Sequence, residues 1–258
     1  MTTPVTVRPV TAQIENSIRT IGGISTTDLA KQFDTPLYIM DVATVRNNCR
    51  HYTDSLKALN VDYTVAYAGK AGMCFKLLNL LAEEGLGTDV VSGGEIHTVL
   101  QTNIDRDKIY FHGNNKSKKE LEMAIEAGIR IVIDNAYELQ LIDSITKETG
   151  KQAQLLIRLK PEIEAHTHEH IQTGQIESKF GVSKAELIPM IQTILDAPNL
   201  QFLGIHGHIG SQIFDPIPYE KLAHLMMDYL IKIKQDTQAP VLELNLGGGI
   251  GIDRKSVV

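Results

Sequence analysis

The sequence predicts an α/β fold, a (β/α)₈ TIM-type barrel that lacks its eighth strand. From about Asn60 onward, seven short apolar runs rich in β-branched residues alternate with amphipathic helical stretches. The first four runs recur about every 20–25 residues. A strand, a helix and a strand at such spacing are typical of parallel βαβ units. An open doubly wound sheet is the alternative arrangement of the same units.

The residues before the regular pattern predict a separate N-terminal segment over 1–60. Residues 24–34 favour a short helix capped by Thr26 or Thr27. The run Thr35–Asp41 predicts a strand, and a longer helix follows it, from about Thr44 to Leu59.

Residues 61–258 are assigned to the incomplete barrel. Its helices carry clear start and stop signals, namely capping boxes at Ser117 with Glu120 and at Ser183 with Glu186, and a terminating Gly128. The predicted strands are Tyr63–Ala68, Thr88–Val91, Ile109–His112, Ile129–Ile133, Leu155–Leu159, Phe202–His208 and Val241–Leu246.

Polar, ionisable or glycine residues follow every predicted strand. In a parallel barrel the C-terminal strand ends form one rim, and chemistry gathers there. The candidates at this rim are Lys70, Asp89, His112, Asp134, Arg158, His206, His208, Ser211, Gly247, Gly248 and Gly249. The sequence therefore predicts an active site at that rim.

Lys70 is the candidate for covalent chemistry. A lysine just past a buried strand can project into the barrel mouth, where partial desolvation lowers the pKa of its amine. A solvated surface lysine is the alternative. Gly247–Gly249 follow the seventh strand, where consecutive glycines let backbone N–H groups converge on an anion, and Ser211 can add a hydroxyl. A flexible turn is the alternative for these glycines.

The remaining candidates are charged or aromatic. His208 can stack on a flat cofactor ring or bind a metal. Asp89 and Arg158 end predicted buried strands, where charges are costly unless paired or functional; a structural ion pair is their alternative. The HTHEH run at 166–170 suggests a metal at first sight, but no carboxylate or cysteine pattern completes it. We expect no metal site, and a solvated or substrate-facing loop there.

Composition limits the possible partners. The 25 basic and 31 acidic residues give a net charge of −6, which argues against a nucleic-acid binder. No run has the length of a membrane span and the N-terminus has no signal-peptide core, so we expect a cytoplasmic protein without membrane contact.

Six motifs together resemble the fold-type III pyridoxal-phosphate decarboxylases, which share an alanine-racemase-like barrel. They are AYAGKA, DVVSGGE, FHGNNKS, AHTHEHIQTGQIESKFGV, GIHGHIGSQIFD and LNLGGGIGI. The similarity extends from about Asp28 to Ile252. FHGNNKS and the long insertion favour the diaminopimelate branch over its ornithine and arginine relatives.

The resemblance implies pyridoxal 5′-phosphate as the cofactor and a small amino acid as the substrate. Lys70 would hold the cofactor covalently and His208 would stack on its ring. Ser211 and Gly247–Gly249 would bind the phosphate, and Asp89 and Arg158 would line the cofactor's edge. The implied reaction is decarboxylation of meso-2,6-diaminoheptanedioate to L-lysine and carbon dioxide, the last step of lysine biosynthesis, in a homodimer.

The sequence departs from the family pattern at three places. Gly69 precedes the lysine where a larger residue is usual, and Gly207 replaces a usual cysteine. Family members also continue past Val258 into an eighth strand with a Glu-Pro-Gly-Arg motif and a β-domain, to which Thr35–Asp41 would belong. We therefore expect this chain to be of low stability and poorly active by itself.

Three rival functions remain open from the sequence. One is an ornithine- or arginine-type decarboxylase, or a racemase on a similar barrel. The second is a homologue that binds pyridoxal phosphate without turnover. The third is a barrel without this cofactor, such as a sugar-phosphate enzyme.

Overall fold

The computed structural model describes residues 8–161, 180–240 and 243–252. These residues form two compact units. The N-terminal unit comprises the described residues up to Val65 together with Glu83–Gly85 and Ile252. The barrel unit comprises Ala66–Ala82 and the described residues from Leu86 to Gly251.

A small antiparallel sheet opens the N-terminal unit. Its strands are β1 (Gln13–Glu15), β2 (Ile18–Ile21) and β3 (Ile24–Ser25), in that order. Two-residue turns with positive φ, Asn16-Ser17 and Gly22-Gly23, join them. Such turns match the twist of hairpin strands. This sheet was not predicted from the sequence, although the Gly22-Gly23 pair between isoleucines is a hairpin signal.

Two helices follow in the same unit. Helix α1 (Thr26–Phe33) is capped by Ser25, whose hydroxyl accepts the Asp28 N–H at 3.4 Å. The predicted cap at Thr26 or Thr27 is therefore wrong, because Ser25 holds the extended conformation that a cap needs and Thr26 is already helical. Helix α2 (Val42–Lys57) confirms the second predicted helix, slightly shifted.

The predicted strand Thr35–Asp41 is wrong. These residues form an irregular connection between α1 and α2. A strand is stable only through hydrogen bonds to a neighbouring strand, and no described residue pairs with this segment. Its apolar side chains are consequently exposed, with Tyr38 fully so.

The barrel unit contains a seven-stranded parallel sheet in the order β10-β9-β8-β7-β6-β5-β4. The order follows the chain without a reversal, whereas a doubly wound sheet reverses at its switch point. The seven predicted strands are confirmed with shorter or shifted ends. They are β4 (Ala66–Ala68), β5 (Gly87–Val90), β6 (Ile109–Phe111), β7 (Arg130–Ile133), β8 (Ala153–Leu159), β9 (Leu200–Gly207) and β10 (Glu243–Asn245).

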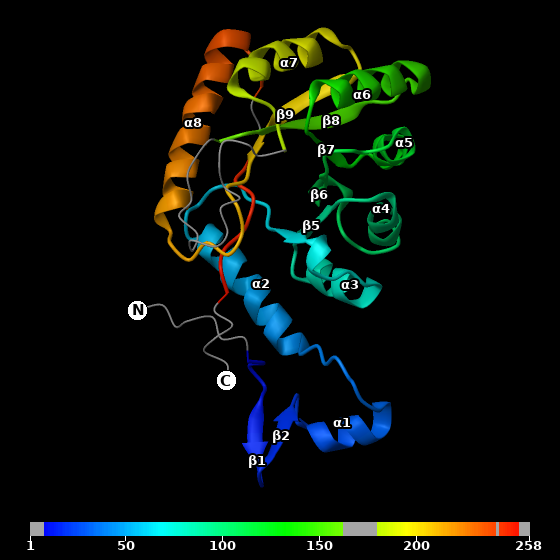
Figure 1. Cartoon of the computed structure of the whole chain (residues 1–258), viewed down its shortest axis with the longest axis vertical. Helices are drawn as coiled ribbons and strands as arrows, with labels where there is room; N and C mark the ends of the chain where they lie inside the picture. Colours follow the sequence, from blue (N-terminus) through cyan, green and yellow to red (C-terminus); the bar gives the residue numbers. More distant parts are fainter. Residues whose placement is uncertain (1–7, 162–179, 241–242, 253–258) are drawn as a thin grey trace. The chain divides into compact units, whose positions relative to one another are not determined.

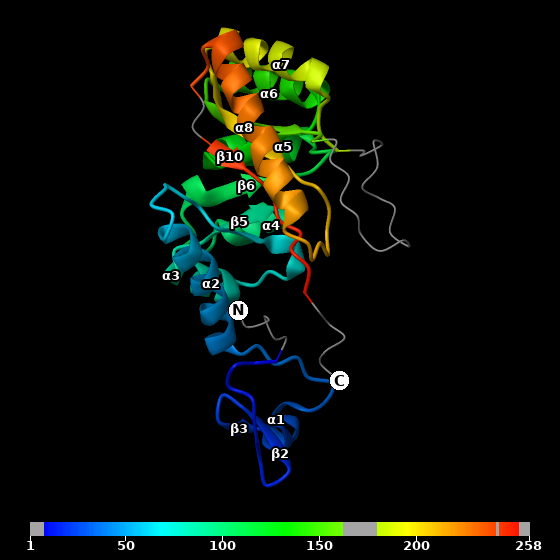
Figure 2. The ribbon, with the colours of Figure 1, turned by 90° about the vertical axis from the view of Figure 1, so that its left-hand side faces the viewer.

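Helices connect successive strands and cover the outer face of this sheet (Figures 1 and 2). Both predicted capping boxes are present, and Gly128 ends its helix with φ +71°. The helices are α3 (Phe75–Glu83), α4 (Gly93–Val99), α5 (Lys118–Ala127), α6 (Ala136–Thr149), α7 (Lys184–Asp196) and α8 (Ile217–Thr237), with 3₁₀ turns η1 (Gly69–Ala71) and η2 (Arg106–Lys108).

The inner face shows that the sheet is curved like a barrel wall. Glu243 of β10 accepts a hydrogen bond from the Tyr110 hydroxyl of β6 at 3.3 Å, although three strands lie between them. In a flat sheet, four strand spacings would separate these backbones by roughly 19 Å. Ala66 of the edge strand β4 also packs against the inner cluster around Tyr110. The architecture is therefore TIM-barrel-like.

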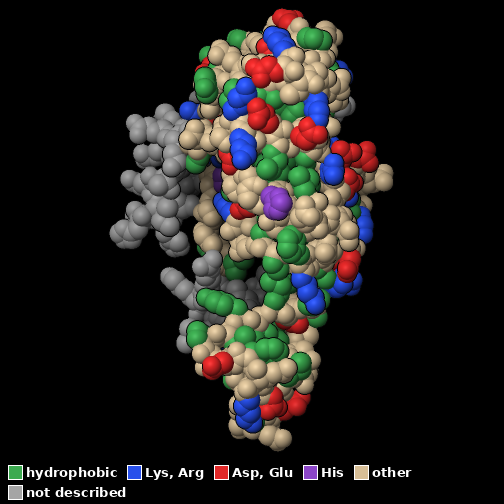
Figure 3. Space-filling model, turned by 90° about the vertical axis from the view of Figure 1, so that its right-hand side faces the viewer, with side chains coloured by type: hydrophobic (Ala, Val, Ile, Leu, Met, Phe, Trp, Pro, Cys, Tyr) green, Lys and Arg blue, Asp and Glu red, His purple; other side chains and the backbone are tan. Residues whose placement is uncertain are grey.

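The outer surface is mixed in charge. Figure 3 shows acidic and basic side chains interspersed over one face, without a large area of one sign. Among the described residues, no helix is long and apolar enough to cross a membrane.

Candidate active site

Parallel strands bring the candidate residues to one end of the barrel unit. Ala68, two residues before Lys70, is the register partner of Asp89 on the adjacent strand. Arg158 on β8 is paired with His206 on β9, and His208 follows that strand directly. Because the C-terminal ends of parallel strands lie at the same end of the sheet, the fold brings these residues together at one rim.

Lys70 lies in the 3₁₀ turn η1, immediately after β4. A Cβ on Gly69 would lie 2.5 Å from the Asp89 carbonyl oxygen, so only glycine lets this turn lie against β5. This close approach gives a packing reason for glycine at position 69 in this chain. The Lys70 side chain is exposed. The expected partial desolvation is therefore absent among the described residues, because the turn carries Lys70 past the strand end.

Asp89, His112 and His206 place polar atoms inside the rim without hydrogen bonds. Asp89 Oδ1, His112 Nε2 and His206 Nδ1 are buried and have no hydrogen-bond partner among the described residues. His112 Nε2 lies 3.5 Å from Asp89 Oδ1, beyond a good hydrogen bond, and its ring meets the edge of His206 with centroids 4.8 Å apart. Unpaired buried polar groups are costly, and a ligand with polar edges would relieve that cost.

His208 is a half-buried imidazole held neutral. Burial is the largest cause that lowers its pKa to about 4, and the nearby positive charges of Arg158 and Lys70 contribute to the same lowering. Burial also brings the pKa of His206 well below its ordinary value. Both rings are therefore uncharged at neutral pH. The half-buried His208 can offer its ring face to a ligand, whereas His206 is buried.

The glycine run and the loop after β9 are joined into one cradle. The Ile213 N–H donates to the Gly249 carbonyl at 3.0 Å, and the Gly251 N–H donates to the Ile213 carbonyl at 2.9 Å. Gly249 has φ +105°, and a Cβ there would lie 1.9 Å from the Gly210 carbonyl oxygen. A Cβ on Gly248 would meet open space. The exposed Ser211 lies in the same loop.

Gly207, where the family resemblance leads us to expect a cysteine, lies against the side chains of α8. A Cβ on Gly207 would lie 3.0 Å from the Met226 sulfur of α8. That contact is tight, but the neighbour is the flexible end of a side chain. A Cβ here would require the Met226 and Leu222 side chains to give way by a few tenths of an ångström.

A buried ion pair behind the rim was not identified from the sequence. Lys116 Nζ donates to Glu138 Oε1 at 2.7 Å and to the Gly113 and Val132 carbonyls at 2.8 Å each. Burial lowers the pKa of Lys116 and raises that of Glu138. Lys116 is in the FHGNNKS motif, but its pairing with an N-terminal residue of α6 depends on tertiary structure.

Arg158 has two neighbours that sequence reasoning did not assign. Its guanidinium carbon lies 4.7 Å from the centroid of the Phe180 ring. Asp134, at the end of β7, accepts the Gly181 N–H at 2.9 Å, and its negative charge acts on Arg158. The HTHEH run at 166–170 lies outside the described residues. The described residues contain no group of three or more potential metal ligands.

The chemistry of this rim fits a phosphorylated aromatic aldehyde such as pyridoxal phosphate. The glycine cradle and Ser211 suit the phosphate, and the neutral face of His208 suits the ring. Lys70 supplies an amine for the aldehyde. The buried polar atoms of Asp89, His112 and His206, which have no hydrogen bond among the described residues, could be satisfied by the polar groups of the ring.

The comparisons with known proteins agree with this fit. The family model "pyridoxal-dependent decarboxylase, pyridoxal binding domain" matches residues 42–257. Diaminopimelate decarboxylase of Bacillus methanolicus is 45% identical over 235 residues, covering 90% of this chain and 54% of that protein. The corresponding Bacillus subtilis protein is 41% identical over 235 residues, with the same coverage.

Solved structures give the same result. The crystal structure of diaminopimelate decarboxylase from M. jannaschii superposes with a TM-score of 0.89 at 34% identity, covering 96% of this chain and 58% of that one. The chain thus spans about half the length of the curated relatives that it matches. It belongs to the pyridoxal-dependent decarboxylase family and contains that family's pyridoxal-binding domain.

Proposed function

We propose that this chain binds pyridoxal phosphate at the barrel rim and serves the decarboxylation of meso-2,6-diaminoheptanedioate to L-lysine and carbon dioxide. The observation that carries the proposal is the convergence of Lys70, His208 and the Ser211–glycine cradle at one end of the barrel unit. The similarity to diaminopimelate decarboxylases supports the substrate. A related M. jannaschii structure is a complex with L-lysine.

Each residue contributes a distinct physical function. Backbone N–H groups of Gly248 and Gly249 and the Ser211 hydroxyl would bind the phosphate. The Gly247 N–H donates to Asn245 Oδ1 at 2.8 Å, so Gly247 would shape the turn around the phosphate and not bind it through that group. The neutral ring of His208 stacks against the cofactor and fixes its plane. Lys70 Nζ would hold the cofactor and is the amine that could give or take a proton beside it. Pyridoxal phosphate, when bound, would supply a conjugated ring able to take up the electron pair that remains on the α-carbon when carbon dioxide leaves.

Reduction with borohydride tests the cofactor site. The chain is mixed with pyridoxal phosphate, reduced, digested and mapped by mass spectrometry. We expect the pyridoxyl mass on Lys70, its loss in Lys70→Ala, and its retention in the control Lys76→Ala, an exposed lysine on α3. Labelling that is spread over surface lysines, with none on Lys70, would contradict the site.

Substrate choice is tested by carbon dioxide release. Turnover is measured side by side on meso-2,6-diaminoheptanedioate, L-ornithine and L-arginine. We expect the first to be preferred; preference for either of the others would assign the chain to those branches. Cofactor capture without any turnover, in a version of the chain extended by the C-terminal part of a full-length relative, would favour a non-catalytic pyridoxal-phosphate protein.

We also propose a homodimer in the cytoplasm. The resemblance to homodimeric decarboxylases supports the assembly, and a role in amino-acid synthesis supports the location. Analytical ultracentrifugation tests the assembly, and a single species at 28.5 kDa would contradict it.

A further inference from the structure

Arg158 faces an aromatic ring at the edge of the candidate site. Its guanidinium carbon lies 4.7 Å from the centroid of Phe180, within the roughly 6 Å at which a cation is attracted to a ring face. Both residues are partly buried. Removal from water strengthens such an attraction, so the ring constrains the guanidinium.

Backbone contacts beside Phe180 hold the segment that carries its ring. The Val182 N–H donates to the Arg158 carbonyl at 2.8 Å, and the Lys160 N–H donates to the Val182 carbonyl at 3.0 Å. Gly181 has φ +85°, and a Cβ there would lie 2.8 Å from the Arg158 carbonyl oxygen. Only glycine allows this approach, so the segment is built to lie along the end of β8.

Asp134 completes the arrangement from the neighbouring strand. Its side chain is buried, and its Oδ1 accepts the Gly181 N–H at 2.9 Å. Its charge favours the charged form of Arg158 and opposes the effect of burial, which lowers the pKa of that guanidinium. One carboxylate therefore anchors the segment that carries Phe180 and also balances the arginine.

We propose that Phe180 and Asp134 are positioning residues that hold the Arg158 guanidinium in the orientation in which it meets the bound cofactor. This inference rests on the proposed function, because it assumes that Arg158 lines the cofactor site. A free arginine samples many rotamers, and ordering it on binding costs side-chain entropy. Holding it in advance removes that cost from cofactor binding.

Two variants of Phe180 distinguish the effect of its aromatic ring on cofactor binding from the effect of its size. Phe180→Leu keeps an apolar side chain without a ring, whereas Phe180→Tyr keeps the ring. We expect Phe180→Leu to weaken pyridoxal phosphate binding roughly 3- to 30-fold, and Phe180→Tyr to bind like the unchanged chain. Asp134→Asn retains an oxygen for the Gly181 N–H but removes the charge, and should also weaken binding. Tyr137→Ala, an exposed aromatic on α6, is the control.

A double-mutant cycle shows whether Phe180 acts through Arg158. In an Arg158→Ala background, Phe180→Leu should have no further effect on binding. Equal losses in both backgrounds, or a Phe180→Tyr loss as large as that of Phe180→Leu, would overturn the proposal.

A cofactor-free measurement keeps this inference separate from the proposed function. The rate at which an arginine-selective dicarbonyl reagent modifies Arg158 is followed by mass spectrometry without pyridoxal phosphate. We expect faster modification in Phe180→Leu than in the unchanged chain or Phe180→Tyr. Unchanged rates would overturn the positioning role even if the cofactor binds, whereas a chain that fails to bind the cofactor would refute the proposed function alone.

Discussion

Gly248 and Gly249 are neighbours in the chain, but their surroundings differ. Gly249→Ala forces a Cβ within 1.9 Å of the Gly210 carbonyl in a conformation that L-residues rarely adopt. We expect a loss of about 1–3 kcal/mol in the free energy of unfolding, together with weaker pyridoxal phosphate binding. Denaturant titration and cofactor titration measure the two effects.

Gly248→Ala is the matched control for stability. A Cβ there meets open space, so we expect unfolding within about 0.5 kcal/mol of the unchanged chain. A loss of cofactor binding in this variant without a loss of stability would indicate that the open space receives the phosphate. Equal destabilisation by both alanines would contradict the account of the cradle.

His208 makes stability depend on pH in a defined window. Its pKa of about 4 in the folded chain lies below the ordinary value of 6.5 given for histidine. The unfolded chain therefore binds the proton first as pH falls, and stability decreases from pH 6.5 toward pH 4 by at most about 1.4 kcal/mol per unit. His206 acts in the same direction.

Replacing the imidazole tests this dependence. In His208→Gln, we expect a shallower decrease in the free energy of unfolding over the same window. His97→Gln, an exposed histidine on α4, should retain the full decrease. If His208→Gln follows the unchanged chain at every pH, His208 is not held neutral by the fold.

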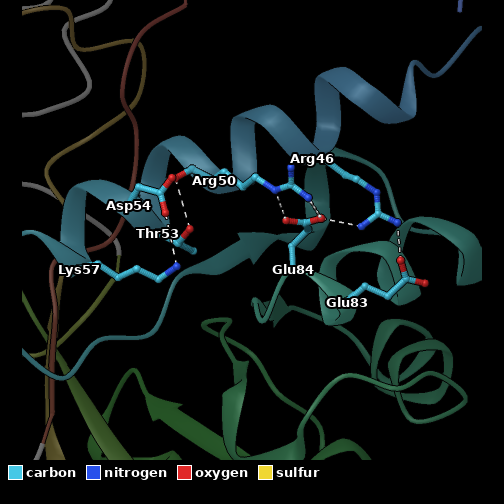
Figure 4. Close-up of polar contacts among 7 residues, drawn as sticks. All are labelled: Arg46, Arg50, Thr53, Asp54, Lys57, Glu83 and Glu84. Atoms are coloured by element: carbon cyan, nitrogen blue, oxygen red, sulfur yellow. Dashed lines mark hydrogen bonds and ion pairs between the residues drawn. The ribbon is translucent and has the colours of Figure 1, made fainter.

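At the scale of elements, Glu84 connects two arginines of α2 (Figure 4). Arg50 donates to both Glu84 oxygens at 2.8 and 3.0 Å, and Arg46 donates to it at 2.5 Å. The Glu84 side chain is 8% exposed, whereas that of Glu83, which also meets Arg46, is 60% exposed. Exposed ion pairs contribute little, so Glu84 should dominate this cluster.

We expect Glu84→Gln to lower the free energy of unfolding by about 1–2 kcal/mol, and the control Glu83→Gln by less than about 0.5 kcal/mol. The hydrogen bonds from Arg50 and Arg46 lower the pKa of Glu84. Its stabilisation is therefore present above the ordinary glutamate pKa and is lost as pH falls through the lowered value. The difference between Glu84→Gln and the unchanged chain should disappear in acid; a difference that persists there would not be electrostatic.

Elements with strong local signals were predictable from the sequence, and elements that depend on partners were not. The barrel strands are marked by β-branched runs that end in polar or glycine residues, and the helices between them are marked by capping boxes. The strand pattern and the helix pattern therefore predict the same alternating fold. Thr35–Asp41 has the composition of a strand, but strand formation is decided by a partner. The β1–β3 sheet was missed because its short strands have little apolar alternation.

A site residue was predictable from the sequence where its position just after a predicted strand was enough to identify it. Lys70, His208 and Gly247–Gly249 follow strands directly, and the barrel geometry then gathers them. Phe180 and Glu138 could not be identified in this way. Each acquires its partner only when segments distant in sequence pack together, as in the 22-residue separation between Lys116 and Glu138.

At the scale of the barrel unit, one ion pair links distant strands across the inner face. Arg130 Nε of β7 donates to Glu243 Oε1 of β10 at 2.7 Å, and Tyr110 of β6 donates to the other oxygen. The two charged side chains are 15% and 22% exposed. The pair therefore connects the edge strand β10 to the middle of the sheet and favours its curvature.

Breaking this pair should destabilise the barrel unit more than breaking a pair within one helix. Glu243→Gln leaves the partly buried Arg130 with only the exposed Asp107 carboxylate, 3.9 Å away, and we expect a loss of about 2–4 kcal/mol in the free energy of unfolding. The control is Asp143→Asn, which breaks the exposed pair with Lys147 on α6 and should cost less than about 0.5 kcal/mol. Hydrogen exchange locates the effect, because Glu243→Gln should speed exchange at the β9–β10 amides if the pair holds the edge strand in place. Faster exchange that is spread evenly over all seven strands would instead show that Glu243 stabilises the barrel unit as a whole without fixing its edge.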